Sequence, residues 1–299
     1  MIKTLNLTKR FESFTALDNI STVFEKGCVY GLVGSNGSGK STLLRLMSGI
    51  YYADGGEITA DGEKIFNNPK IKEKIFFLPD SPYFFKGATL LSTLDFYKKL
   101  YPSFSMERFS YLSRVFPIEL NKKIDNMSKG MQRQAALMIA LSVCPSYLLL
   151  DEAFDGLDPV MRGVLKNLLI ESIDKSGTTV IIASHNLREL EDLCDHVALL
   201  HSGKLIISDS LERIKENIHK VQVAFKEPPS DIFFSKLNIL KSERTGSLYR
   251  MVIRGDSSSI METINASCPI FAELIEPTLE EIFIFEMEGA DYDVKKLLL

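Results

Sequence analysis

The chain has 299 residues, enough for one large domain and a smaller one. Its net charge of -4 at neutral pH gives no overall positive field, so we expect no nucleic-acid partner. The four cysteines lie far apart without metal-binding spacing, which is typical of reduced thiols in the cytoplasm. No stretch approaches the roughly 18 apolar residues that span a bilayer, so any membrane path would need another chain.

A strand, a glycine-rich loop and a helix follow one another near the start of the chain. Residues 28–33 form an apolar run typical of a buried strand, and residues 40–49 have the pattern of a helix. Between them lies a complete GxxxxGK(S/T) sequence, whose backbone N–H groups would point at one phosphate while the helix dipole attracts it. Lys40 would reach the β- and γ-phosphates, and the Ser41 hydroxyl would face Mg²⁺. The residues expected to bind a nucleoside triphosphate are Gly34, Ser35, Asn36, Gly37, Ser38, Gly39, Lys40, Ser41 and Thr42.

The runs that follow predict an α/β protein with a hairpin beside its main sheet, an inserted helical subdomain and a C-terminal appendage. Asp61-Gly62 lies between two short strand-like runs and predicts a β-hairpin beside the main sheet. Residues from about 86 to 140 carry apolar side chains at helical spacing, which indicates a helical subdomain inserted into the sheet. Strand-like alternation returns near the end of the chain. We therefore expect residues 1–217 to form the main domain and residues 218–299 a small α+β appendage.

Two adjacent acids end a later apolar run. Residues 147–150 have the character of a buried strand and are followed by Asp151 and Glu152. Ligands of open α/β sheets bind at the carboxyl ends of the strands, so both carboxylates would face the phosphates. Asp151 would contact Mg²⁺ directly or through water, and Glu152 would polarise an attacking water. Such acids are also common on protein surfaces, but their place after the glycine-rich loop favours the catalytic interpretation.

A guanine-nucleotide site is excluded by a missing motif. GTPases use an NKxD sequence to recognise guanine. The nearest match, residues 121–125, reads Asn-Lys-Lys-Ile-Asp, with one residue too many, and lies in the predicted helical region.

Residues 126–134, Asn-Met-Ser-Lys-Gly-Met-Gln-Arg-Gln, resemble the LSGGQ signature of ATP-binding cassette (ABC) ATPases in its SKGM form, found in many exporter subunits. Ser128 and Gly130 stand at the serine and the second glycine of that motif. The resemblance extends over residues 1 to about 215. It implies a P-loop NTPase fold of the ABC type that binds ATP and Mg²⁺ and hydrolyses ATP.

Three further residues match family motifs in the expected order. Phe11 stands where an aromatic ring stacks on adenine, although it could also be a core aromatic. Asp158 matches the D-loop aspartate. His185, after a predicted strand, matches the switch histidine that contacts the γ-phosphate, although a lone histidine is more often structural. The resemblance makes Glu152 and His185 the catalytic pair.

The signature segment implies a second subunit. In this family its donors face the ATP of the opposite cassette, so a complete site needs two cassettes arranged head to tail. Serine also favours a helix N-cap, and both roles hold together because a helix N-terminus attracts phosphate. Two positions depart from the motif, since Lys129 replaces a glycine and Met131 replaces the final glutamine. The residues expected to face the opposite ATP are Ser128, Lys129, Gly130 and Met131.

One position departs from the family pattern more sharply. After the predicted strand at residues 75–79 the family usually has glutamine, and this chain has Asp80. An ionised acid would bind Mg²⁺ more strongly and add negative charge beside the γ-phosphate. We expect Asp80 to join Ser41 and Asp151 as a metal-site residue that alters hydrolysis but not ATP binding.

The resemblance implies the ATP-hydrolysing subunit of an ABC transporter. Two such cassettes, identical or related, would close around two ATP molecules and drive a separate transmembrane permease. The protein would lie in the cytoplasm, on the inner face of the cell membrane. Tyr83, Phe84 and Phe85 would help to dock the permease or belong to the core. Residues 276–283 resemble the P-(S/T)-L-E-(D/E)-(I/V)-F ending of exporter subunits.

The alternative is a soluble ABC ATPase that acts on ribosomes or DNA. Translation-factor members carry two cassettes in one chain, and only one P-loop occurs here. Chromosome-associated members insert a long coiled coil between the P-loop and the signature, and this chain has no heptad run there.

Overall fold

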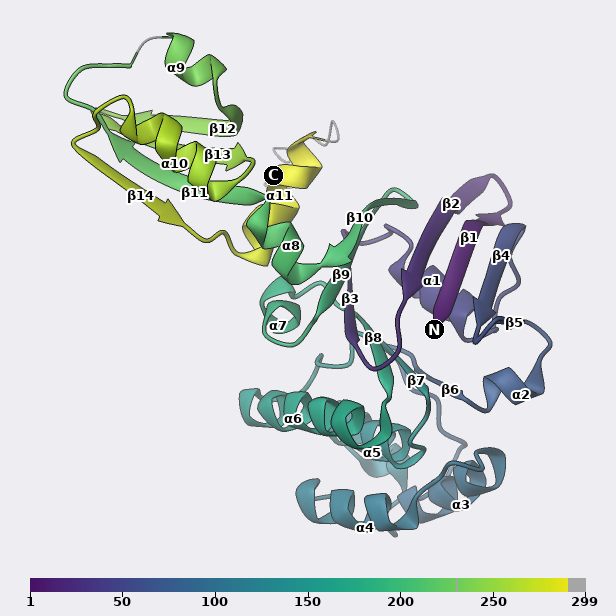
Figure 1. Ribbon diagram of the computed structural model, residues 1–299. Helices are drawn as coiled ribbons and strands as arrows, with labels where there is room; N and C mark the ends of the chain where they lie inside the picture. The colour runs from purple at the N-terminus through teal and green to yellow at the C-terminus, as the bar shows by residue number, and fades with distance from the viewer. Residues whose placement is uncertain (230, 290–299) are drawn as a thin grey trace. The chain divides into compact units, whose positions relative to one another are not determined.

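The computed structural model describes residues 1–229 and 231–289 (Figure 1). Two compact units make up this part of the chain: Met1–Asn186 with His196–Ser208, and Leu187–Asp195 with the residues from Asp209 on. The division falls before the predicted boundary at residues 217 and 218. It does so because helix α8 (Leu211–Glu216) packs against strand β11 (Ile218–Ala224) of the second unit.

An antiparallel sheet with the order β2-β1-β4-β5 begins the first unit. Its strands are β1 (Ile2–Phe11), β2 (Phe14–Phe24), β4 (Gly55–Ala60) and β5 (Glu63–Lys64). Strands β4 and β5 form the predicted hairpin, in which Asp61 and Gly62 have φ values of 53° and 83°. Both central residues of a type I′ hairpin turn need such positive φ values. After β5, the chain passes through Asn67, with φ 56°, and enters helix α2 (Pro69–Lys72).

A second sheet, with the order β10-β9-β3-β8-β7-β6, positions the predicted site. Its strands are β3 (Val29–Val33), β6 (Ile75–Leu78), β7 (Tyr147–Asp151), β8 (Thr179–Ala183), β9 (His196–His201) and β10 (Lys204–Ser210). The neighbours β3, β8 and β7 run parallel. The glycine-rich loop follows β3, Glu152 follows β7 and His185 follows β8, so all three lie at one edge of the sheet.

Helix α1 (Lys40–Met47) supplies the centre of the main core. Its Leu43, Leu44 and Met47 are fully buried in one cluster with side chains of both sheets. The cluster includes Leu17 of β2 and Leu149 of β7. Burial of this face fixes the helix N-terminus, and hence the glycine-rich loop, against the second sheet.

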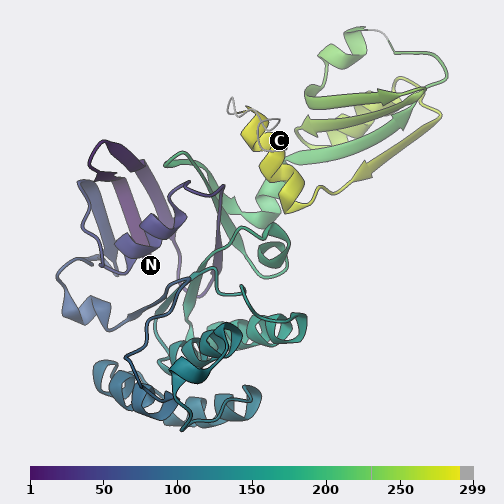
Figure 2. The ribbon, with the colours of Figure 1, turned by 180° about the vertical axis from the view of Figure 1, so that it is seen from behind.

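The segment predicted to be helical contains α3 (Leu90–Leu100), α4 (Met106–Val115) and α5 (Lys129–Ser142). Figures 1 and 2 show these three helices together at one end of the first unit, away from its N-terminal sheet. Thr89 and Ser92 form a capping box that begins α3. Helix α6 (Pro159–Ser176) follows β7 and begins at its N-cap Asp158.

The second unit contains an antiparallel sheet with the order β12-β13-β11-β14. Its other elements are α7 (Leu187–Glu191), α9 (Asp231–Ser235), β12 (Asn238–Thr245), β13 (Leu248–Arg254), α10 (Ser257–Asn265), β14 (Phe271–Ile275) and α11 (Leu279–Gly289). The alternating residues Val221, Val223, Met251 and Ile253 are buried together with Ile260 of α10. The strand-like alternation in the sequence therefore marks one buried face of this sheet.

Candidate active site

The loop between β3 and α1 depends on glycine at its two ends. Gly34 has φ 155° and Gly39 has φ 107°. A Cβ atom on Gly34 would lie 2.2 Å from the carbonyl oxygen of Leu200, and one on Gly39 would lie 2.7 Å from that of Ala16. The backbone therefore packs too closely for any side chain at these positions, which shapes the loop as a cradle for an anion.

The ammonium group of Lys40 lies inside this loop. Its Nζ donates to the carbonyl oxygens of Gly34 and Ser35 at 2.7 and 3.1 Å. Burial lowers the pKa of Lys40, and the negative charges of Glu152 and Asp151 oppose this effect. A phosphate would offer this buried cation stronger, charged acceptors than the two carbonyl groups.

A cavity of about 250 Å³ opens in front of the loop and helix α1. Its lining residues are Phe11, Phe14, Ala16, Asn36, Gly37, Ser38, Gly39, Lys40, Ser41, Thr42 and Glu152. Phe11 and Phe14 face each other where β1 and β2 meet, and 59% of Phe14 is exposed. The ring of Phe11 already packs edge-on against Tyr51, with their centroids 5.4 Å apart. The cavity thus joins an anion cradle to two aromatic rings, as a nucleotide requires.

Ser41 and Asp151 are brought together as predicted for a metal site. The Ser41 hydroxyl donates to Oδ1 of Asp151 at 3.0 Å, and Asp151 is buried. Burial raises the pKa of Asp151, while the bond from Ser41 and the charge of Arg45 oppose the rise. A hydroxyl and a carboxylate are oxygen ligands of the kind that Mg²⁺ prefers, so these residues fit the ion. The hydroxyl of Ser38 is also buried near the loop without a hydrogen-bond partner among the described residues.

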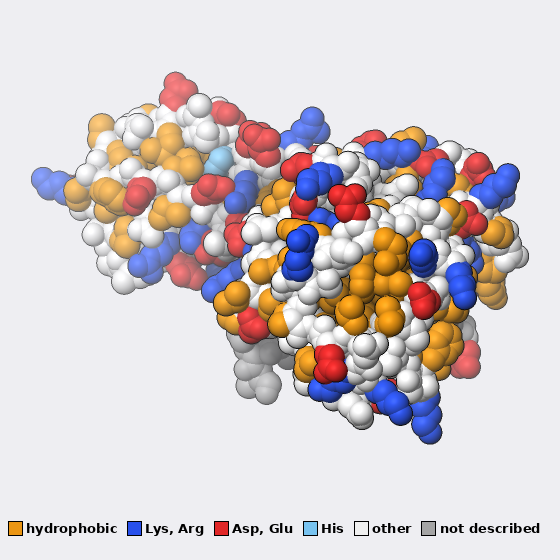
Figure 3. All heavy atoms as spheres, turned by 90° about the horizontal axis from the view of Figure 1, so that it is seen from below, with side chains coloured by type: hydrophobic (Ala, Val, Ile, Leu, Met, Phe, Trp, Pro, Cys, Tyr) orange, Lys and Arg blue, Asp and Glu red, His pale blue; other side chains and the backbone are white. Residues whose placement is uncertain are grey.

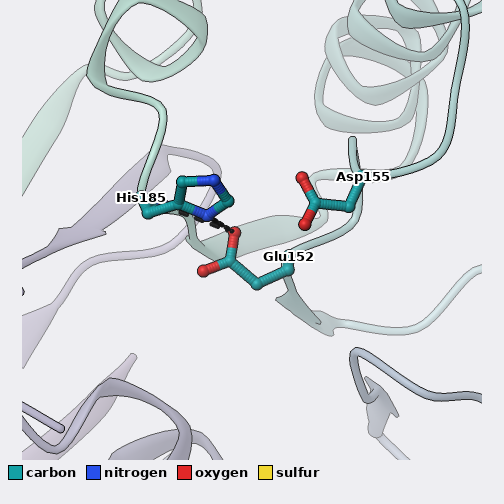
Figure 4. A group of neighbouring side chains, drawn as sticks. All are labelled: Glu152, Asp155 and His185. Carbon is teal, nitrogen blue, oxygen red and sulfur yellow. Dashed lines mark hydrogen bonds and ion pairs between the residues drawn. The ribbon is translucent and has the colours of Figure 1, made fainter. Parts of the chain in front are cut away.

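Glu152 and His185 meet across neighbouring strands. Figure 4 shows the His185 ring directed at the Glu152 carboxylate, with Nδ1 lying 3.0 Å from Oε2. Glu152 has φ 50°, a strained value that its N–H stabilises by donating to the Ala183 carbonyl oxygen at 2.8 Å. Asp155 completes a group whose possible ligand atoms all lie within 4.8 Å of one another. The site therefore holds a carboxylate at the edge of the cavity, oriented by an imidazole.

The signature residues lie outside the cavity of their own chain. Ser128 caps helix α5, and its Oγ accepts from the Met131 N–H at 3.3 Å. Ser128 and Lys129 are exposed. A Cβ atom on Gly130 would lie 3.0 Å from the carbonyl oxygen of Gly156, so this turn packs closely on the loop after β7. Asp158 likewise acts here as a helix cap, accepting from two backbone N–H groups at 3.0 Å.

Asp80 is paired with Arg133 of helix α5. Nη2 of Arg133 donates to Oδ1 of Asp80 at 2.9 Å, and Nη1 donates to the Pro79 carbonyl oxygen at 3.2 Å. Asp80, which the sequence predicts as a metal-site residue, is therefore paired with the guanidinium of Arg133.

Phe14, Asp155 and Arg133 were not predicted. Phe14 had a usable signal, because it lies three residues after Phe11 beside a short turn. Asp155 stands three residues after Glu152, so the pair of acids after β7 could have drawn attention to it. No local pattern predicted Arg133, since its pairing depends on how α5 lies against the end of β6.

Comparisons with known proteins agree with this geometry. Residues 17–155 match the family model described as ABC transporter. The ABC transporter ATP-binding protein YtrB of Bacillus subtilis is 30% identical over 97% of this chain and 99% of its own length. The bacitracin transport ATP-binding protein BcrA of Bacillus licheniformis is 30% identical over 74% of this chain and 73% of its own. The dimeric structure of MJ0796, a bacterial ABC transporter cassette, has a TM-score of 0.65 and 24% identity, covering 71% of this chain and 99% of that one.

Proposed function

The chain belongs to the ABC transporter family, and on that premise we propose that two such cassettes close around two ATP molecules to drive export through a separate membrane subunit. The family hydrolyses ATP, so the chain is an ATPase and an ATP-binding protein of a transporter. The observation that carries the proposal is the meeting of Lys40, Glu152 and two aromatic rings at one cavity.

The loop and its flanking acids bind the triphosphate. Lys40 exchanges the carbonyl oxygens of Gly34 and Ser35 for phosphate oxygens, and the loop N–H groups complete the cradle. Ser41 and Asp151 would hold Mg²⁺, and the bound ion would neutralise phosphate charge. Phe11 and Phe14 receive the adenine.

Glu152 acts as the general base. It accepts a proton from a water whose oxygen attacks the γ-phosphorus, while the bond from that phosphorus to the β-phosphate oxygen breaks. The products are ADP and phosphate. His185 contacts one carboxylate oxygen of Glu152. When ATP binds, the same histidine contacts the γ-phosphate.

A second cassette completes the site. Ser128 and Lys129 are exposed at the N-terminus of α5, outside the cavity of their own chain. That helix N-terminus offers N–H donors and a positive dipole end to the γ-phosphate of another copy or a related chain. MJ0796, which shares the fold, is described as a dimer, and this supports the arrangement.

An exposed aromatic group on the helical part of the first unit supports a membrane partner. Tyr83 is 78% exposed, and its ring packs on Phe85, which in turn packs on Phe96. Figure 3 shows apolar side chains gathered on the face where α3 and α4 lie. In the described residues no helix is both long and apolar enough to cross a membrane. We therefore assign the transport path to a partner that docks on this aromatic group. The name of BcrA, a bacitracin transport ATP-binding protein, supports a transport role.

Co-purification with a membrane protein tests this assignment. The chain is expressed with an affinity tag in its native cells and is recovered from detergent-solubilised membranes, and any multi-span membrane protein recovered with it is identified. We expect the wild-type chain to co-purify, and the Tyr83→Ser, Phe85→Ser variant to lose the partner while keeping its ATPase activity. Retention of the partner by this variant would reject the docking surface, and a wild-type chain that recovers no membrane protein would favour a soluble role.

A further inference from the structure

The sheet of the second unit has one face covered by two of its helices. Along the chain the elements follow the order β11, α9, β12, β13, α10, β14, which is a split β-α-β topology. Phe233 of α9 and Ile260 of α10 are buried in one cluster with Val221 and Met251. Because side chains alternate between the two faces of a strand, the neighbours of these strand residues lie on the opposite face, away from both helices.

Helix α11 packs on this opposite face through two ion pairs. Nζ of Lys220 on β11 donates to Oε1 of Glu281 at 2.6 Å, and Arg254 at the end of β13 pairs with Glu286. The first turn of the helix is anchored separately, because Leu279 is buried and its N–H donates to a carboxylate of α7. The helix is therefore held at a fixed place over the sheet.

A cavity of about 300 Å³ lies between α11 and the sheet. Ile284 and Phe285 line it from the helix, on the same helix face as Glu281. Val252, which is 7% exposed, and Gln222 line it from the sheet. A volume of this size is enough for a small organic molecule, and these side chains offer it a largely apolar surface.

The charged side chains around the cavity leave one positive charge in excess. The lining contains three cations and two acids, namely Lys220, Lys241, Arg250, Glu243 and Glu281. Lys220 pairs with Glu281, as described above. Glu243 stands opposite Arg250 in the sheet but pairs with Lys241, at 3.7 Å. Arg250 therefore has no ion pair with any residue that the structure describes.

This excess charge determines which ligands fit. The guanidinium of Arg250 presents parallel donors that match the two oxygens of a carboxylate. Ile284 and Phe285 would pack against an apolar body, whereas Glu243 and Glu281 would repel a second negative charge. The lining therefore complements an apolar molecule that carries a single carboxylate.

We propose that the second unit binds a small apolar carboxylate in this cavity, with the carboxylate on Arg250 and the apolar body against Ile284 and Phe285. The second unit then has a ligand site of its own. The inference goes beyond the proposed ATPase function and does not depend on it, because every residue that lines the cavity lies in the second unit.

Probes of equal chain length test the charge preference. Octanoate, octanol and octyl phosphate share one apolar chain and differ in the charge of the head group. Their dissociation constants for the full-length chain are measured by ligand-detected NMR. We expect octanoate to bind most tightly, because octanol brings no anion to Arg250 and octyl phosphate brings additional negative charge toward Glu243 and Glu281. Equal binding of octanoate and octanol, tighter binding of octyl phosphate, or no binding of octanoate at millimolar concentration would overturn the proposal.

Substitutions locate the head group and the apolar chain. Arg250→Gln should weaken octanoate binding by roughly tenfold and leave octanol binding unchanged. Phe285→Ser should weaken the binding of both, because it removes apolar contact. Arg244→Gln is the matched control, since Arg244 is exposed on the other face of the sheet, over the ring of Tyr249. Wild-type octanoate binding by Arg250→Gln, or an equal loss in Arg244→Gln, would reject Arg250 as the anion-binding residue.

Two further measurements test whether the probe binds elsewhere. Excess ATP with Mg²⁺ should leave octanoate affinity unchanged, because the nucleotide cavity lies in the first unit. Displacement of octanoate by ATP would place the probe in that cavity and reject the proposal. Loss of octanoate binding as the chain self-associates at higher protein concentration would assign the cavity to a second copy of the chain instead.

Discussion

His185 holds one oxygen of Glu152 through two contacts, with Nδ1 3.0 Å and the backbone N–H donor 3.3 Å from Oε2. The other carboxylate oxygen makes no hydrogen bond to a described residue, so it is available to a water in the cavity. This arrangement orients the carboxylate that would act as the base.

Removal of the His185 ring should lower turnover more than ATP binding. We expect His185→Ala to reduce kcat by about 10²–10⁴-fold, the usual contribution of positioned acid–base groups. His185→Asn keeps a donor near the place of Nδ1 and should retain more activity. Phosphate release measures kcat, and filter binding measures ATP affinity. Equal activity of His185→Ala and the wild-type chain would remove His185 from the mechanism.

Asp151→Asn should make the chain more stable without nucleotide while weakening its binding of ATP with Mg²⁺. Burial is the main cause that raises the pKa of Asp151, so the ionised group destabilises the fold above that pKa. The asparagine keeps an acceptor for Ser41 without the charge. The gain in melting temperature should be full at neutral pH and should disappear as the pH falls through the raised pKa, because the wild-type carboxyl then becomes neutral.

Thermal unfolding of Asp151→Asn and the wild-type chain, measured from neutral to acidic pH, tests whether the variant has the higher melting temperature. A variant that melts below the wild-type chain at neutral pH would contradict the assigned electrostatic cost.

An introduced tryptophan can report which aromatic position contacts the adenine, because the chain contains no tryptophan. In Phe11→Trp and in Phe14→Trp the fluorescence should change when ATP binds and should stay constant with tripolyphosphate, which lacks a base. Phe271→Trp is the matched control, since Phe271 is 46% exposed on β14 of the second unit. A silent tryptophan at both positions 11 and 14 would place the adenine elsewhere.

The last helix should stabilise the second unit only. Leu279 is buried, and its N–H donates to Oε2 of Glu191 on α7 at 3.1 Å. Leu279→Ala should lower the free energy of unfolding by about 2–5 kcal/mol, the usual cost of a cavity at a buried leucine. Leu240→Ala, at a position 38% exposed on β12, should cost about 0.5 kcal/mol or less.

Thermal unfolding and ATP binding are both measured for these leucine variants. We expect ATP affinity to remain at the wild-type level in both, because the nucleotide cavity lies in the first unit. Loss of ATP binding in a folded Leu279→Ala protein would show that the units are not independent.

Local motifs suffice to predict most of the candidate site. The loop at Gly34, the acids after β7 and His185 could be predicted because each follows a short buried strand, and parallel strands bring such ends to one edge. The hairpin at Asp61-Gly62 was found because its turn chemistry is local. The pairing of Asp80 with Arg133 depends on the packing of α5 against β6, which no short pattern encodes. The assignment of α7 to the second unit likewise arises from its packing against α11.

The most direct test of the central claim is the mass in solution of Glu152→Gln with and without ATP and Mg²⁺, measured by light scattering. This variant should bind ATP but hydrolyse it poorly, and we expect ATP to convert it from monomer to dimer. Adding Ser128→Arg should keep the ATP-bound protein monomeric, because the arginine side chain then blocks the signature segment from contacting the ATP of the opposite cassette. ATP-bound Glu152→Gln that stays monomeric, or a dimer that tolerates Ser128→Arg, would contradict the composite site.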